Sequence, residues 1–141
     1  MLLLWNLVSL RAEDTDFTRQ WTRTNKCRGF GIVNLDSAGN VIALNGDSTI
    51  AKYDAGTGKR LWSRDVDKID LRRFVAGTFL DLLLVDRNDN VFAIGREAEF
   101  FYSTKVYRFS PEGFLTWYND SAGFMRDAAI DANGDLLDSS P

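Results

Sequence analysis

The chain has 141 residues, a formal net charge of −3 and no histidine. The absence of histidine excludes Ser-His-Asp catalysis, histidine-ligated zinc and the usual general base near neutral pH. The single cysteine, Cys27, excludes an intrachain disulfide and a thiolate metal cluster. The net negative charge disfavours nucleic-acid binding, and the length fits one domain at most. We therefore expect no nucleic-acid partner and no cofactor.

Residues 1–16 are an apolar segment followed by a polar linker. Residues 1–10, MLLLWNLVSL, are mostly apolar, but a membrane span needs about twenty such residues, so we expect none. Two interpretations stay open. The segment is either the apolar core of a signal peptide, which would make the protein periplasmic or extracellular, or an apolar strand or arbitrary start within a longer reading frame. Residues 17–24 then alternate in polarity and predict a strand that carries Trp21.

The chain contains two copies of a strand–turn–strand unit. In residues 50–65, Gly56 and Gly58 supply a turn in which positive φ has no steric cost. Residues 106–120 repeat this unit with a turn that is one residue shorter. The matched pairs are Tyr53 and Phe109, Asp54 and Ser110, Gly58 and Gly113, and Trp62 and Trp117.

A second unit recurs three times, at residues 35–41, 85–91 and 130–136. Each copy has an apolar residue, an aspartate that opens a turn, and an apolar residue after the turn. Gly39, Asp89 and Gly134 hold the position that requires a left-handed backbone. The copies lack the glycine position and late glutamate of a calcium loop, so we interpret all three as hairpin turns.

Two hairpin types that alternate every 45–50 residues predict an all-β fold with radial repeats. We expect β-propeller blades of four antiparallel strands, with the first four at about 30–35, 41–45, 48–54 and 59–65. Residues 17–141 would form a partial propeller of two complete blades, about 28–66 and 73–120, and one divided blade, 122–141 with 17–24. We expect the connection 66–74 to be exposed because its charges are mixed.

The sequence LDSAGNVIAL followed by IAKYDAGTGKRLW resembles the β-propeller repeat common in exported bacterial proteins. It is also similar to the quinoprotein repeat signature Ala-x-Asp-x-x-Thr-Gly-x-x-x-Trp, although Lys52 stands at the alanine position. The matching residues are Asp54, Thr57, Gly58 and Trp62. The first resemblance implies a secreted binding scaffold, and the second implies part of a quinone-cofactor dehydrogenase.

Between its second and third predicted strands the second blade has a longer loop, 96–102, than the first blade, which has only 45–47 there. Inserted loops on repeat proteins often carry binding sites. The candidate binding residues there are Glu97, Phe100, Phe101 and Tyr102. The alternative is that the aromatic residues begin the next strand and pack inward.

Asp81 is a carboxylate in the otherwise apolar stretch 79–85. It would either face a central channel or form an ion pair with an arginine such as Arg72 or Arg73. The channel interpretation would make it one of the two carboxylates of a propeller glycosidase.

Three blades leave a ring incomplete, because closed propellers have about four to eight. The chain is then either a fragment of a larger propeller or one of several copies that complete a ring as a homo-oligomer. The function that we expect is a non-catalytic scaffold that binds a protein or a carbohydrate. The alternatives are a portion of a quinone-cofactor dehydrogenase and a portion of a propeller glycosidase.

Overall fold

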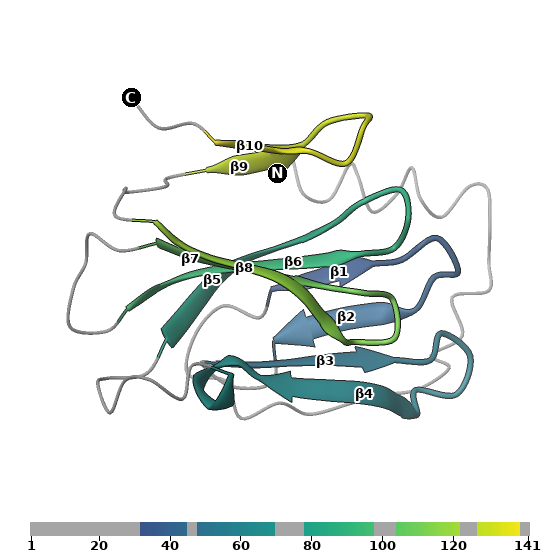
Figure 1. Cartoon of the computed structure of the whole chain (residues 1–141). Helices are drawn as coiled ribbons and strands as arrows, with labels where there is room; N and C mark the ends of the chain where they lie inside the picture. The colour runs from purple at the N-terminus through teal and green to yellow at the C-terminus, as the bar shows by residue number, and fades with distance from the viewer. Residues whose placement is uncertain (1–31, 45–47, 70–77, 98–103, 122–126, 139–141) are drawn as a thin grey trace, which may run out of the picture.

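The structure, a computed structural model, describes residues 32–44, 48–69, 78–97, 104–121 and 127–138 (Figure 1). The first sheet has the order β1-β2-β3-β4, with β1 Val33–Leu35, β2 Val41–Leu44, β3 Thr49–Tyr53 and β4 Arg60–Asp65. The second has the order β5-β6-β7-β8, with β5 Thr78–Val85, β6 Val91–Glu97, β7 Thr104–Phe109 and β8 Leu115–Ser121. The terminal hairpin consists of β9 Ala128–Ile130 and β10 Leu136–Asp138. The predicted all-β fold with two four-stranded antiparallel units is confirmed, and the described strands form open sheets without a closed ring.

The hairpin turns that the structure describes lie at one end of the molecule, on the right in Figure 1. Those that follow β1, β5 and β9 are the three predicted aspartate turns, and their left-handed positions are confirmed. Gly39 has φ 80° and Gly134 has φ 86°. Asp89, with φ 62°, is the one non-glycine residue with positive φ in the described part of the chain. Its carboxylate accepts hydrogen bonds from Ser37 N at 2.8 Å and Ser37 Oγ at 2.6 Å, and so joins the first turns of the two sheets.

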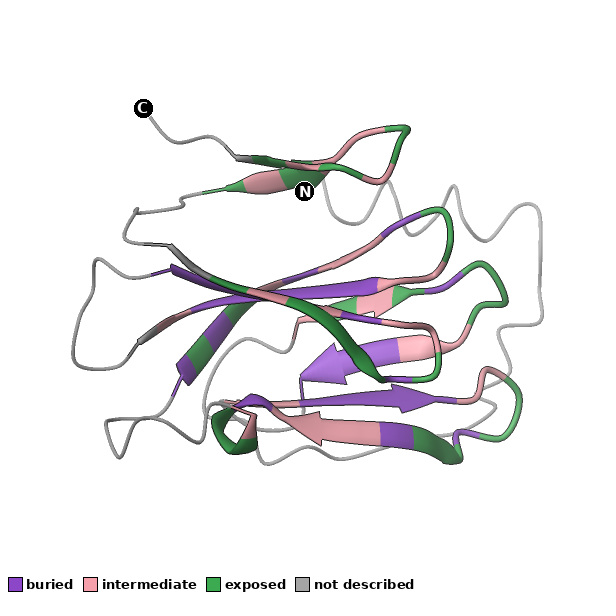
Figure 2. Ribbon diagram, viewed as in Figure 1, coloured by how far each residue is buried: buried purple, intermediate pink, exposed green. Residues whose placement is uncertain are grey.

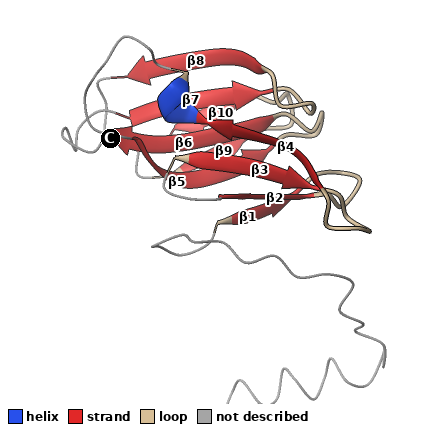
Figure 3. Ribbon diagram, turned by 90° about the horizontal axis from the view of Figure 1, so that it is seen from below, coloured by secondary structure: helices blue, strands red, loops and turns tan. Residues whose placement is uncertain are grey.

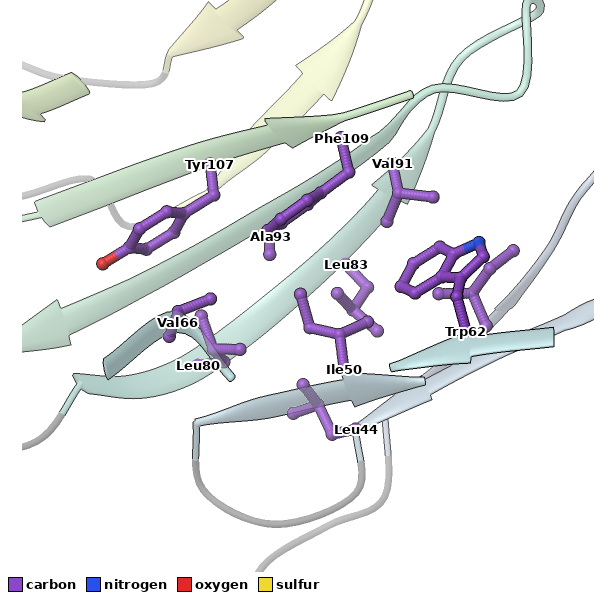
Figure 4. Close-up of a cluster of buried hydrophobic side chains, with 11 residues drawn as sticks. Leu44, Ile50, Trp62, Val66, Leu80, Leu83, Val91, Ala93, Tyr107 and Phe109 are labelled. Atoms are coloured by element: carbon purple, nitrogen blue, oxygen red, sulfur yellow. The ribbon is translucent and has the colours of Figure 1, made fainter. Parts of the chain in front are cut away.

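The two four-stranded sheets pack face to face around the main hydrophobic core. We call the face of the first sheet that carries Ile42, Ile50 and Trp62 its front face. Side chains from this face point toward the second sheet (Figure 4). We call the face of the second sheet that they meet, which carries Val91 and Phe109, its back face, and the opposite face its front face. The Trp62 and Phe109 rings stack with centroids 6.4 Å apart. The buried members of this cluster are Ile42, Leu44, Ile50, Trp62, Val66, Leu80, Leu83, Val91, Ala93, Tyr107 and Phe109.

The front face of the second sheet packs against the terminal hairpin. Phe92, Ile94 and Val106 are buried there beneath residues of both hairpin strands. Strand β5 therefore has apolar contacts on both faces. The first strands of the two sheets and of the terminal hairpin lie side by side, with β1 next to β5 and β5 next to β9. Figure 3 shows the resulting layers from below.

The expectation that residues 66–74 are exposed is wrong at Val66, which is completely buried. Val66–Lys68 form the short 3-10 helix η1, drawn in blue in Figure 3. The Asp65 side chain accepts a hydrogen bond from Asp67 N and caps this helix. The mixed charges of Asp67 and Lys68 do face solvent, but the turn directs Val66 back into the core between the sheets.

Candidate functional site

The contact between the first two sheets is fixed by polar side chains that donate to a turn. The turn joins β7 to β8, and its Pro111 and Gly113 carbonyl oxygens accept three hydrogen bonds from the first sheet. Lys52 Nζ lies 3.1 Å and Trp62 Nε1 3.0 Å from the Pro111 oxygen. Arg64 Nε lies 2.6 Å from the Gly113 oxygen. We call Lys52, Trp62 and Arg64 the three-donor set, because together they recognise main-chain oxygens of the next sheet.

Gly113 allows the Trp62 indole to lie against this turn. A Cβ atom at Gly113 would be 2.7 Å from Trp62 Cδ2, closer than such atoms can approach. Gly113 also has φ 83°, a backbone conformation that favours glycine. As a result Trp62 is only 8% exposed. The glycine that the repeat alignment assigned to the turn thus also makes room for a tryptophan of the other sheet.

Lys52 is held by a buried ion pair with the first aspartate turn. Its Nζ lies 2.8 Å from Asp36 Oδ2, and both side chains are buried. Burial by itself would raise the pKa of Asp36. The hydrogen bonds from Lys52 and Asn40 outweigh that effect and lower the pKa below its ordinary value. Asp36 therefore stays ionised and fixes the Lys52 ammonium toward the turn of the next sheet.

The second sheet repeats this arrangement with Asp86 and Arg108. Arg108 Nη2 lies 3.4 Å from Asp86 Oδ2, and the guanidinium carbon lies 5.3 Å from the Phe92 ring centroid. Burial again raises the pKa of Asp86, but hydrogen bonds from Asn90 and backbone amides and the Arg108 charge lower it overall. Each sheet thus buries an aspartate that orients a basic residue on its third strand.

The second sheet carries a second set of donors on its front face. Strand pairing places Trp117 opposite Arg108, as it places Trp62 opposite Lys52. Asn119 lies opposite Val106, the position that corresponds to Arg64 in the first sheet. We call Arg108, Trp117 and Asn119 the open face. Each of these three positions carries a side chain that can donate a hydrogen bond, as the matching position of the first sheet does.

The open face is exposed to solvent, whereas the three-donor set is covered by the turn between β7 and β8. Trp117 is 44% exposed, against 8% for Trp62. The Arg108 side chain is 37% exposed, against 7% for Lys52. Buried Arg108 Nε has no hydrogen-bond partner within the part of the chain that the structure describes. Figure 2 shows β8 exposed along most of its length, because the terminal hairpin covers only the inner strands of this face.

The four residues predicted from the loop 96–102 are not brought into this surface by any described contact. Glu97 ends β6, where its backbone pairs with Thr78, and its side chain lies outside the described residues. Phe100, Phe101 and Tyr102 also lie outside them. The loop site therefore stays a prediction.

Asp81 forms an ion pair with a different arginine from those predicted. Asp81 Oδ2 lies 2.6 Å from Arg96 Nε, and each side chain is more than two-fifths exposed. Arg72 and Arg73 lie outside the described residues. The pairing between β5 and β6 shifts between Leu80 and Leu82, so that Asp81 is the extra residue of a β-bulge. Its exposure comes from this bulge, which the sequence did not indicate.

Within the described ranges, no group of three or more acidic or cysteine side chains could hold a metal ion. The aspartates of the three turns instead accept hydrogen bonds from their own turn amides, at 2.8–3.0 Å. This geometry supports the interpretation of all three as hairpin turns.

Sequence reasoning did not identify Lys52, Arg108 or Asn119 as interface residues. The alignment of residues 50–65 with 106–120 contained the necessary signal, since Lys52 aligns with Arg108 as a basic residue directly before an aromatic one. A charge at the same register of two apolar strands indicates a conserved local role within the repeat. Its buried partner could not be read from the alignment.

No protein-family model matches the chain, and a search of curated proteins finds none with significant similarity. In the portion that the structure describes, no helix has the length and apolar character that crossing a membrane requires. Any assignment of function therefore depends on the structure itself.

Proposed function

We propose that this chain is a non-catalytic β-propeller repeat scaffold that binds a protein partner through the open face. The main observation behind this proposal is the difference between Trp62 and Trp117. The two residues occupy the same register in successive sheets, yet Trp62 is covered and Trp117 is exposed. The covered copy binds a polypeptide turn through main-chain carbonyl oxygens. The open copy retains donors at the same three positions, and so has the chemistry to bind another polypeptide.

The repeated stacking supports the propeller part of the proposal. The front face of the first sheet packs on the back face of the second, and the front face of the second packs on the terminal hairpin. The first strands of the three units follow one another side by side, as they do around a propeller axis. A scaffold of this kind fits the resemblance to repeats of exported proteins, and we propose an exported location with it.

Three described carboxylates have structural partners, which favours a scaffold over an enzyme. Asp36 and Asp86 are buried in ion pairs and hold turns. Asp81, on which the glycosidase interpretation depended, is a surface ion pair at a bulge. A protein partner is favoured over a carbohydrate because the donors of the covered copy bind main-chain oxygens.

The proposal can be tested by selecting displayed 20-residue peptides against the full chain, with counter-selection against the Trp117→Ser variant. We expect peptides whose binding requires Trp117. In parallel, the chain is screened against soluble oligosaccharides and against pyrroloquinoline quinone with calcium. A Trp117-dependent oligosaccharide, or quinone absorbance retained by the protein, would overturn the proposal, as would a failure to recover any Trp117-dependent peptide.

A further inference from the structure

We propose that Asn133 is a site of spontaneous deamidation, and that its conversion to a carboxylate loosens the terminal hairpin from the second sheet. Asn133 lies in the turn between β9 and β10, and it is exposed to solvent. The reaction needs no partner at the open face, so it is independent of the proposed binding function.

The residue that follows Asn133 is Gly134, so no side chain shields the amide nitrogen between them. In the reaction the Gly134 nitrogen loses its proton to water and bonds to Asn133 Cγ. The Cγ–Nδ2 bond breaks, and Nδ2 takes up a proton and leaves as ammonia. Water then opens the five-membered imide at either carbonyl carbon, which gives an aspartate or an isoaspartate at position 133.

The third aspartate turn lacks a side-chain bond that the first two turns have. In those turns an asparagine, Asn40 or Asn90, donates to the carboxylate of the turn aspartate at 2.9 or 2.8 Å. The matching residue of the third turn is Asp135, and an ionised carboxylate cannot donate. Asn133 Nδ2 supplies the bond to Asp131 Oδ2 instead, at 3.4 Å. The amide that leaves in the reaction is therefore the group that binds the turn aspartate.

Asn88 is the internal control for this chemistry. It holds the same place in the second turn, and it is also exposed. Asn88 N and Asn133 N each lie 2.8 Å from the carboxylate of their turn aspartate. The residue after Asn88 is Asp89, whose Cβ lies beside the attacking nitrogen and whose carboxylate is bonded to Ser37. The two sites thus share a turn geometry and differ in the residue that follows the asparagine.

Deamidation would replace a hydrogen-bond donor with a negative charge at the same place. The new carboxylate would face Asp131 Oδ2, which Asn133 Nδ2 contacts in the intact turn, and like charges at such a contact repel each other. The isoaspartate product also adds one atom to the main chain. Two bonds close the turn across this point, from Asp131 N to the Asp135 carbonyl oxygen at 3.0 Å and from Asp135 N to Asp131 Oδ1 at 2.9 Å. The longer main chain would strain both bonds.

The turn and its hairpin lie against the second sheet. A Cβ at Gly134 would be 3.5 Å from Asp86 Oδ2 in the second aspartate turn. The hairpin residues Ala128, Ile130 and Leu136 pack over buried Phe92, Ile94 and Val106. A loosened hairpin would therefore change the surroundings of Ile94. Ile50 lies in the core between the two four-stranded sheets and would keep its surroundings.

The test ages the full folded chain in mildly alkaline buffer and follows each asparagine by peptide mapping with mass spectrometry. Conversion adds the mass difference between an amide and a carboxylate, and chromatography separates the aspartate and isoaspartate peptides. We expect Asn133 to convert at least about tenfold faster than Asn88, because glycine leaves the attacking nitrogen unshielded. Conversion of Asn133 at the rate of Asn88 or more slowly would overturn the proposal.

The effect on the hairpin is measured by NMR of the isoleucine methyl groups in the same aged samples. We expect new Ile94 signals in proportion to the converted fraction, while the Ile50 signals stay in place. The matched control is Asn133→Gln, because glutamine would have to form a six-membered ring and reacts far more slowly. This variant should keep the Ile94 signals of its own fresh sample.

The control variant also separates Asn133 from Asn45, which likewise precedes a glycine but lies outside the described residues. Converted Asn133 with unchanged Ile94 signals would overturn the proposed loosening of the hairpin. The same Ile94 change in aged Asn133→Gln would also overturn it, because the change would then have another origin.

Discussion

The indole Nε1 of Trp62 donates a 3.0 Å hydrogen bond to the carbonyl oxygen of Pro111, 49 residues later in the chain and in the next sheet. This bond joins two copies of the same structural unit, because Pro111 belongs to the turn that repeats the one before Trp62. The corresponding indole, that of Trp117, is 44% exposed. The difference between two equivalent tryptophans makes specific stability effects predictable.

We expect Trp62→Ala to destabilise the fold far more than Trp117→Ala. Removing Trp62 leaves a cavity between the sheets and removes its bond to Pro111, which should cost about 3–5 kcal/mol. Removing Trp117 from an exposed position should cost less than about 1 kcal/mol. Urea unfolding of the two variants measures both values, and each serves as the control for the other. Similar losses of stability would contradict the assignment of one covered and one open copy.

Gly113→Ala should be more harmful than Gly39→Ala. Both glycines have positive φ, 83° and 80°, so both variants should lose about 1–2 kcal/mol from backbone strain. At Gly39 the added Cβ would meet only Ala55 Cβ at 3.8 Å, whereas at Gly113 it would overlap the Trp62 ring. The ring contact should add about 1–3 kcal/mol. Urea midpoints measure the difference, and equal losses would mean that the indole does not lie against this turn.

Gly95→Ala should strongly destabilise the second sheet. A Cβ at Gly95 would overlap the Phe79 carbonyl oxygen, beside the bulge at Asp81, so the backbone of β5 or β6 would have to move. We expect a loss of at least about 3 kcal/mol in urea unfolding. Gly56→Ala is the matched control, because its Cβ would have 3.8 Å of space and its effect should stay within about 0.5 kcal/mol. A similarly small loss at Gly95 would show that the bulge is wrongly placed.

The stability of the fold should fall in acid, partly through Asp36. Its pKa is lower in the folded chain than the ordinary 3.8, so the unfolded state binds protons more readily. The stabilisation is therefore complete above about pH 4 and is lost as the pH falls through the folded pKa. Urea midpoints between pH 3 and 7 should show this fall, and Asp36→Asn should reduce its steepness.

At pH 7 the same Asp36→Asn change should cost about 3 kcal/mol, because it leaves the Lys52 ammonium buried without its carboxylate. Asp81→Asn breaks an exposed ion pair and serves as the control, with an expected cost below about 1 kcal/mol. If Asp36→Asn and the unmodified chain lost stability in parallel below pH 4, the pKa of Asp36 would not be the cause.

The sequence predicted the local structure well because turns and strand alternation are determined by nearby residues. The three aspartate turns, the left-handed backbone of Asp89 and the match of Trp62 with Trp117 all followed from patterns of a few residues. The predicted strands 41–45 and 59–65 differ from β2 and β4 by a single residue at one end.

Contacts between units could not be predicted in the same way. Asp81 pairs with Arg96 because a bulge turns it outward, and Val66 is buried because η1 returns it to the core. Lys52 donates to Pro111 because the sheets stack front to back, which no local pattern shows. The predicted binding loop was chosen by its length, whereas the open face was found only when the two sheets were compared position by position.

The most direct test of this account is the rate at which the indole Nε1 protons of Trp62 and Trp117 exchange with solvent in the full chain, measured by NMR. The account predicts slow exchange at Trp62, which is buried and bonded to Pro111, and fast exchange at Trp117. Variants Trp62→Phe and Trp117→Phe assign the two signals. Fast exchange at Trp62, or equal protection of both indoles, would contradict the front-to-back stacking from which the open face is inferred.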